Sequence, residues 1–102
     1  GNIYIATEQG QIYKFFTGSK QDFNLTTIEP SLNGITKLYT SLDLDRIYIL
    51  ESNSKRIVVI NKEGAFVAQY LFDLLDQNIA DSIIEGKTLY LSVGGKLYQA
   101  EL

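Results

Sequence analysis

The sequence of 102 residues contains no histidine and no cysteine, so the side chains used most often for acid–base and nucleophilic catalysis are missing. Ser–His–Asp triads, Cys–His dyads and ordinary zinc or haem ligation therefore cannot be assembled from this chain. Disulfide bonds are excluded as well, and the redox compartment cannot be inferred from thiols. We expect no enzyme activity, no cofactor, no metal site and no catalytic residue in this chain.

Methionine and tryptophan are also absent, and Pro30 is the only proline. Because neither an initiating Met nor a leader-like segment precedes the first β-rich run, we interpret the sequence as part of a longer chain. The formal net charge is −3 and no basic stretch occurs, which argues against nucleic-acid binding through phosphate contacts. Apolar runs such as residues 57–60 are far shorter than the roughly 20 residues that span a bilayer, so we expect no direct membrane insertion.

What the sequence does contain is an apolar–Tyr–apolar triplet that occurs three times, at intervals of 44 and 42 residues. The triplets are Ile3, Tyr4 and Ile5; Ile47, Tyr48 and Ile49; and Leu89, Tyr90 and Leu91. After a polar turn, each triplet is followed by a second β-rich run, at residues 12–15, 57–60 and 97–100. A period of about 40 to 45 residues made of short strands is typical of β-propeller blades.

The strand signals predict an all-β fold: a β-propeller fragment of about three blades, of which the first and last are incomplete. The domain covers residues 1–102, with blade 1 at about 1–34, blade 2 at about 35–75 and blade 3 at about 76–102. Roughly ten antiparallel strands are expected, at residues 2–7, 11–16, 23–28, 36–42, 46–51, 56–61, 65–72, 79–85, 87–93 and 96–102. Residues 71–79 form either one helical turn or a strand that continues into an irregular acidic connection. A sandwich or barrel is the alternative fold, but it does not require the recurrence.

Inner propeller strands are covered on both faces, so they should be continuous apolar runs, as at residues 47–50, 57–60 and 89–91. The equivalent residues Tyr4, Tyr48 and Tyr90 then fall on one face of successive sheets. We interpret these tyrosines as packing between blades, with the hydroxyl groups reaching a carbonyl or water. A stacking surface for a sugar or peptide is the alternative.

Residues 45–67 carry one of the triplets, then Glu51, then Asn53 and Arg56 before an apolar strand, and finally Gly64 in a turn. This segment resembles an NHL-type propeller repeat, although that family usually has Asp where this chain has Glu51. The first and third blades match less well because they lack the Asn and Arg pair. Residues 1–13 resemble quinoprotein-like repeats equally, without the Trp that docks those blades. The resemblance implies that Asn53 and Arg56 tie the hairpin to neighbouring blades by hydrogen bonds rather than contact a ligand.

The remaining polar candidates are acidic. They are Asp43, Asp45, Asp73, Asp76 and Asp81. We expect solvated turn carboxylates, because calcium needs about six to eight oxygen ligands and the sequence has no spaced acidic loop with its glycine. The sequence therefore assigns no ligand-binding residue.

About three blades cannot close a ring, since closed propellers have about four to eight. We expect the chain to complete a ring with the rest of its own propeller, or as a homo-oligomer through its terminal blades. The resemblance implies a non-catalytic binding or scaffolding sector, the C-terminal region of a larger bacterial sensor or surface protein. A protein, peptide or glycan ligand and an extracytoplasmic location follow from the same analogy. The alternative is part of a propeller enzyme of lyase, hydrolase or quinoprotein type whose catalytic residues lie on other blades.

Overall fold

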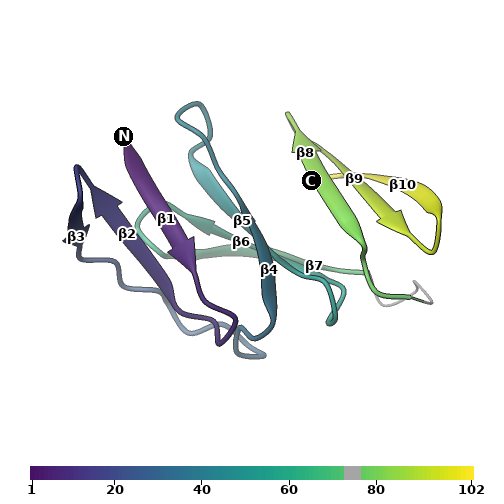
Figure 1. The fold of residues 1–102 in the computed structure, drawn as a ribbon, viewed down its shortest axis with the longest axis horizontal. Coiled ribbons are helices and arrows are strands. Elements are labelled where there is room, and N and C mark those ends of the chain that lie inside the picture. The colour runs from purple at the N-terminus through teal and green to yellow at the C-terminus, as the bar shows by residue number, and fades with distance from the viewer. Residues whose placement is uncertain (73–76) are drawn as a thin grey trace.

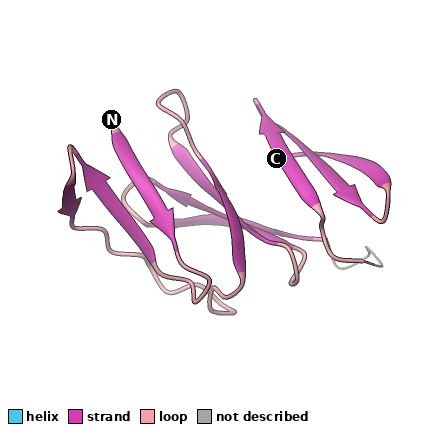
Figure 2. Cartoon of the chain, viewed as in Figure 1, coloured by secondary structure: helices cyan, strands magenta, loops and turns pink. Residues whose placement is uncertain are grey.

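The computed structural model describes residues 1–72 and 77–102, which contain only strands and their connections (Figures 1 and 2). Within these residues, ten antiparallel strands form three separate sheets, which confirms the all-β prediction. The strands are β1 (Asn2–Ala6), β2 (Ile12–Phe16), β3 (Ser19–Gln21), β4 (Ile35–Tyr39), β5 (Arg46–Glu51), β6 (Arg56–Asn61), β7 (Phe66–Leu71), β8 (Asp81–Glu85), β9 (Thr88–Val93) and β10 (Lys96–Glu101). The described part of the chain contains no helix long and apolar enough to cross a membrane.

Each sheet is built from consecutive strands, so the chain completes one sheet before it begins the next. The first sheet has the order β1-β2-β3, the middle sheet β4-β5-β6-β7 and the third sheet β8-β9-β10. Figure 1 shows the three sheets side by side along the longest axis, with the middle sheet between the other two. The apolar–Tyr–apolar triplets lie on β1, β5 and β9, one in each sheet.

Two hydrophobic cores fill the two spaces between sheets. The core between the first and middle sheets contains Ile12, Ile28, Leu32, Ile35, Ile47, Ile49, Val58 and Ile60. The core between the middle and third sheets contains Tyr48, Leu50, Ile57, Val59, Ile79, Leu89, Leu91 and Val93. Because successive strand residues point to opposite faces, β5 and β6 contribute to both cores, and every residue of 47–50 and 57–60 is buried.

That burial confirms the two-faced packing predicted for β5 and β6, whereas the same prediction for residues 89–91 is wrong in this chain. Leu89 and Leu91 are buried against the middle sheet, but Tyr90 points to the opposite face and is only partly buried. The reason is positional: no further sheet among the described residues lies on the Tyr90 side of the third sheet.

Nine of the ten predicted strands are present, with ends displaced by up to three residues, but the strand predicted at residues 23–28 is wrong. The third strand of the first sheet is instead Ser19–Gln21, which follows β2 through a tight turn. Thr17 and Gly18 form that turn with φ of 48° and 81°, the left-handed geometry that suits a two-residue hairpin. The tight Gly94 and Gly95 hairpin is confirmed, because Val93 pairs with Lys96 across it.

Residues 23–28 follow the core without joining a sheet. Phe23 and Leu25 pack against the first core and Ile28 lies inside it. Thr26 fixes the segment to the β6–β7 turn: its N–H donates to the Gly64 carbonyl at 3.0 Å, and its hydroxyl accepts from the Phe66 N–H at 3.0 Å. The segment therefore fastens the first sheet to the middle one.

The sequence left open whether residues 71–79 form a helical turn or an irregular acidic connection. Most of the answer depends on residues 73–76, which lie outside the described part of the chain. Leu71 is the last residue of β7, and residues 77–80 form no helix or strand before β8 begins at Asp81.

Candidate functional site

Arg56 and Glu51 form a buried ion pair at the edge of the first core, with 2.5 Å between Nε and Oε1. The guanidinium also donates to the carbonyl oxygens of Pro30, at 2.8 Å, and Ser31, at 3.3 Å. The second Glu51 oxygen accepts from the Asn33 N–H at 2.7 Å. The pair therefore holds the connection between the first and middle sheets, which confirms the structural contact expected of Arg56.

Asn53 lies in the β5–β6 turn and is exposed. Its side-chain oxygen accepts a hydrogen bond of 3.1 Å from the amide of Asn78, which precedes the third sheet. The neighbouring Ser52 carbonyl accepts from the Ile79 N–H at 3.4 Å. Asn53 thus joins the middle and third sheets, as the sequence predicts.

A set of polar contacts that the sequence did not predict joins β4 to β8. Lys37 forms an exposed ion pair of 3.2 Å with Asp81 and donates to the Ser82 carbonyl at 3.0 Å. The Tyr39 hydroxyl hydrogen-bonds with the backbone and side-chain oxygens of Ser82. These contacts join positions 43 to 45 residues apart, which is about one period of the repeat. The period places the residues on equivalent strands, but the sequence does not indicate that their side chains meet.

The local bonds explain two displaced pKa values. The Ser82 N–H, 2.8 Å from Asp81 Oδ1, and then the Lys37 ammonium hold the pKa of the Asp81 carboxyl below its usual value of 3.8. The hydrogen bond to Asp81 is the largest cause that raises the pKa of Lys37. Both side chains are exposed, so the ion pair joins β4 and β8 at the surface of the protein.

Asp43, Asp45 and Asp81, the acidic candidates among the described residues, form no cluster of three metal-binding side chains. Asp43 is exposed, and Asp45 lies 3.7 Å from Arg46 with its side chain in solvent. Asp73 and Asp76 lie outside the described residues. Within residues 1–72 and 77–102, no three side chains of metal-binding type form a group.

The equivalent tyrosines occupy successive spaces rather than one shared surface. Tyr4 packs against the first core, with its ring edge to face against Phe23 at 5.8 Å between centroids. Tyr48 belongs to the second core, and Tyr90 lines the free face of the third sheet. Packing is therefore confirmed for Tyr4 and Tyr48. The buried Tyr4 hydroxyl makes no hydrogen bond to any described residue, so the carbonyl partner expected as one alternative is not found.

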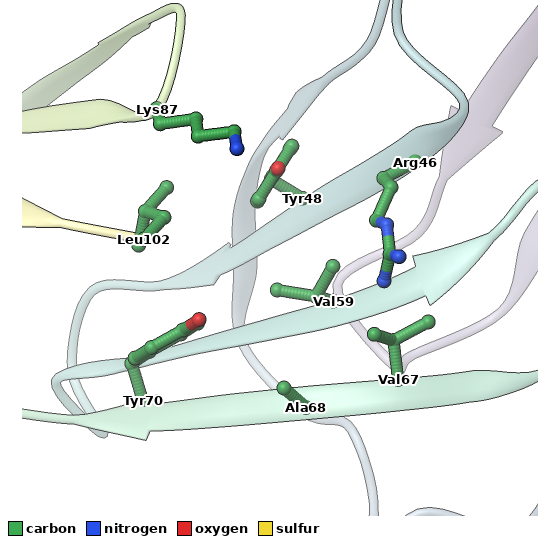
Figure 3. A pocket seen from close by; sticks show the side chains of 8 residues that line it. All are labelled: Arg46, Tyr48, Val59, Val67, Ala68, Tyr70, Lys87 and Leu102. Carbon is green, nitrogen blue, oxygen red and sulfur yellow. The ribbon is translucent and has the colours of Figure 1, made fainter.

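A hollow of about 240 Å³ opens between the middle and third sheets (Figure 3). Its lining residues are Arg46, Tyr48, Val59, Val67, Ala68, Tyr70, Lys87 and Leu102. In Figure 3, Lys87 extends from the third sheet toward Tyr48, and Arg46 lies at the other end of the hollow. Two cations and two phenol groups around an apolar floor suit a ligand that has an apolar body and an anionic group.

No protein-family model matches the chain, and no curated protein or solved structure shows significant similarity to it.

Proposed function

We propose that the chain is a sector of a β-propeller that serves as a non-catalytic binding or scaffolding module. The repetition of the sheets supports this proposal. The triplet lies on the second strand of the middle sheet and on the second strand of the third sheet. By that alignment the first sheet lacks an inner strand before β1, and the third sheet lacks an outer strand after β10.

The observation that carries the proposal is the unequal burial of equivalent residues. Ile47 and Ile49 are 0% exposed because the first sheet covers them. Their equivalents on β1, Ile3 and Ile5, are 61% and 50% exposed. In a radial stack of sheets, a middle sheet is covered on both faces and the end sheets repeat its apolar pattern. A two-sheet sandwich has neither feature.

The polar contacts support the NHL-like character of the repeat. The side chains of Arg56 and Asn53 form hydrogen bonds outside their own hairpin. Each contacts a segment that lies next to a neighbouring sheet in the chain. The non-catalytic part of the proposal rests on two observations. The chain lacks His and Cys, and the two residues with displaced pKa values, Lys37 and Asp81, lie at the surface rather than in a cleft.

A tandem protein tests the sector architecture. Two copies of residues 1–102 are joined by a flexible Gly/Ser linker of roughly 20 residues, whose r.m.s. span is about 25 Å. We expect a monomer that unfolds in one transition. Its midpoint of thermal unfolding should not depend on protein concentration, and it should exceed that of the single chain at low concentration. The matched control carries Ile5→Asp in both copies and should lose this gain. Two halves that unfold independently, at the midpoint of the single chain, would contradict the sector.

The binding role is tested at the hollow of Figure 3. We expect a peptide with a glutamate beside an apolar residue to shift the NMR signals of Tyr48 and Tyr70, and its glutamine counterpart to do so less. Double substitution of Arg46→Gln and Lys87→Gln should abolish the difference between the peptides. Equal shifts from both peptides in the unsubstituted protein would argue against an anion-selective site.

A further inference from the structure

The face of the first sheet that points away from the middle sheet is apolar and uncovered. Ile3 and Ile5 of β1 lie on it, and their cross-strand partners on the same face are Phe15 and Tyr13 of β2. In the middle and third sheets the equivalent face is covered by the C-terminal-side face of the preceding sheet. In both cases the covering surface is the face of a sheet that carries the tyrosine of the triplet.

The matching surface is present at the other end of the chain. On the free face of the third sheet, Tyr90 lies opposite Ile83 of β8, and Leu97 of β10 lies opposite Ser92. Ile83 and Leu97 are 57% and 75% exposed. Tyr90 occupies the position from which Tyr4 and Tyr48 pack against the next sheet.

We propose that a second copy of this chain covers the Ile3–Ile5 face, and that it does so with the Tyr90 face of its third sheet. This inference rests on the proposed function, because it treats the sheets as equivalent blades. The contact is head-to-tail, since the two faces belong to opposite ends of the chain, and it continues the stacking already present between the three sheets.

The number of sheets decides the size of the assembly. Head-to-tail contacts form a ring when the rotation closes. Two copies supply six sheets, within the range of about four to eight blades seen in closed propellers, whereas three copies would exceed that range. The structure therefore points to a dimer with two identical contacts.

The charges on the two faces are complementary. Lys20 of β3 pairs with Phe15 and so shares the Ile3–Ile5 face, where its ammonium lies 4.8 Å from the Tyr13 ring centroid. Glu85 and Glu101 both pair with Thr88 and so share the Tyr90 face. Opposite charges at the rim favour the head-to-tail contact over contacts between two like faces.

Size-exclusion chromatography with light scattering, across a wide range of concentration, tests the inference on the full 102-residue chain. We expect twice the chain mass of 11.5 kDa. Ile5→Asp and Ile83→Asp should each raise the dimer dissociation constant by a factor of about 30 or more. Both side chains are already exposed in one copy, so these variants should fold. Leu42→Asp is the matched control, because Leu42 is 87% exposed on the β4–β5 turn of the middle sheet and belongs to neither end sheet. This variant should leave the mass unchanged.

Mixing the two variants identifies the direction of the contact. An Ile5→Asp chain has an intact Tyr90 face and an Ile83→Asp chain has an intact Ile3–Ile5 face, so the mixture should regain one of the two contacts and associate more tightly than either variant alone. If Ile83→Asp stays fully dimeric, the contact is face-to-face between like surfaces and the inference is wrong. A parent chain that is monomeric throughout, or larger than a dimer, also overturns it. If the single chain is monomeric while the tandem protein closes, the second-copy inference fails and the propeller sector stands.

Discussion

At the scale of single residues, the structure contains two tyrosine hydroxyls in opposite situations. The Tyr4 hydroxyl is buried without a hydrogen-bond partner, whereas the Tyr39 hydroxyl bonds to Ser82 across the space between two sheets. We expect Tyr4→Phe to stabilise the protein by about 1 kcal/mol, because it removes an unsatisfied polar atom. Tyr39→Phe should destabilise it by about 1 kcal/mol, because the Ser82 oxygens lose their hydrogen bonds to the Tyr39 hydroxyl. Urea denaturation of both variants measures the difference, and equal effects would contradict the assignment.

The Asp81 carboxyl offers a test of its two hydrogen-bond donors. Because its pKa is lowered in the folded protein, it contributes stability above its usual value of 3.8, and that stability is lost as the pH falls through the lowered value. We expect Lys37→Met to raise the pKa of Asp81 only part of the way to 3.8, since the larger cause, the Ser82 N–H, remains. NMR titration of the Asp81 carboxyl carbon gives the value directly. A full return to 3.8 would show that Lys37 alone sets it.

Residue positions differ in how far the sequence predicts them. The contacts that Arg56 and Asn53 make beyond their own hairpin were expected, because the spacing of these residues resembles a known repeat. The contact between Lys37 and Ser82 was not, because it depends on how far apart two sheets lie and how they are turned. Tyr4 was predictable as a packing residue, but its missing partner depends on atoms that no pattern of side chains specifies.

At the scale of elements, the connection between the first and middle sheets depends on a buried charge pair. Arg56→Met leaves Glu51 without its cation and frees the carbonyls of Pro30 and Ser31, so we expect a loss of about 3 to 5 kcal/mol. The matched control, Arg46→Met, removes an exposed ion pair and should change stability by about 0.5 kcal/mol or less. Urea denaturation at neutral pH compares the two. Similar losses would mean that the buried pair does not hold the connection.

The β6–β7 turn passes so close to residues 23–28 that it requires a glycine. A Cβ on Gly64 would lie 2.4 Å from the Asn24 carbonyl oxygen, and φ is +97° there. Gly86 is the matched control, because its φ is also positive, at +63°, and open space surrounds it. We expect Gly86→Ala to cost about 1 to 2 kcal/mol from backbone strain alone. Gly64→Ala should cost clearly more in thermal unfolding, because the segment held by Thr26 must also move.

The same segment shows why nine strands could be predicted and the third could not. Phe23 and Leu25 alternate with polar residues as in a half-buried strand, and Ile28 follows out of phase. These apolar residues pack on a core, and their backbone does not pair with a neighbouring strand. The strand that does pair, Ser19–Gln21, is short and polar and carries no hydrophobic signal. Alternation of apolar residues indicates which face of a segment is buried. It does not indicate which groups accept and donate the backbone hydrogen bonds.

At the scale of the whole molecule, burial is concentrated in the middle sheet. β5 and β6 have neighbouring strands on both edges and a core on both faces, whereas β3 is short and largely exposed. We therefore expect backbone amides of β5 and β6 to exchange with solvent most slowly, at rates set by global unfolding, and those of β3 to exchange fastest. Hydrogen exchange followed by NMR measures this order. Equal protection in all three sheets would contradict it.

Tyr4 and Tyr48 face the next sheet along the chain, and Tyr90 points the same way from the third sheet onto a free face. The stack therefore has a direction, and its two ends are unlike. Two unlike ends that fit each other permit addition without limit unless the accumulated rotation returns the last sheet to the first. A substitution that changes the angle between sheets while leaving both end faces intact would then convert a closed particle into a growing fibre. Ile3 and Ile5 make this face suitable for a partner. Polymerisation of this protein would thus begin at the same two residues.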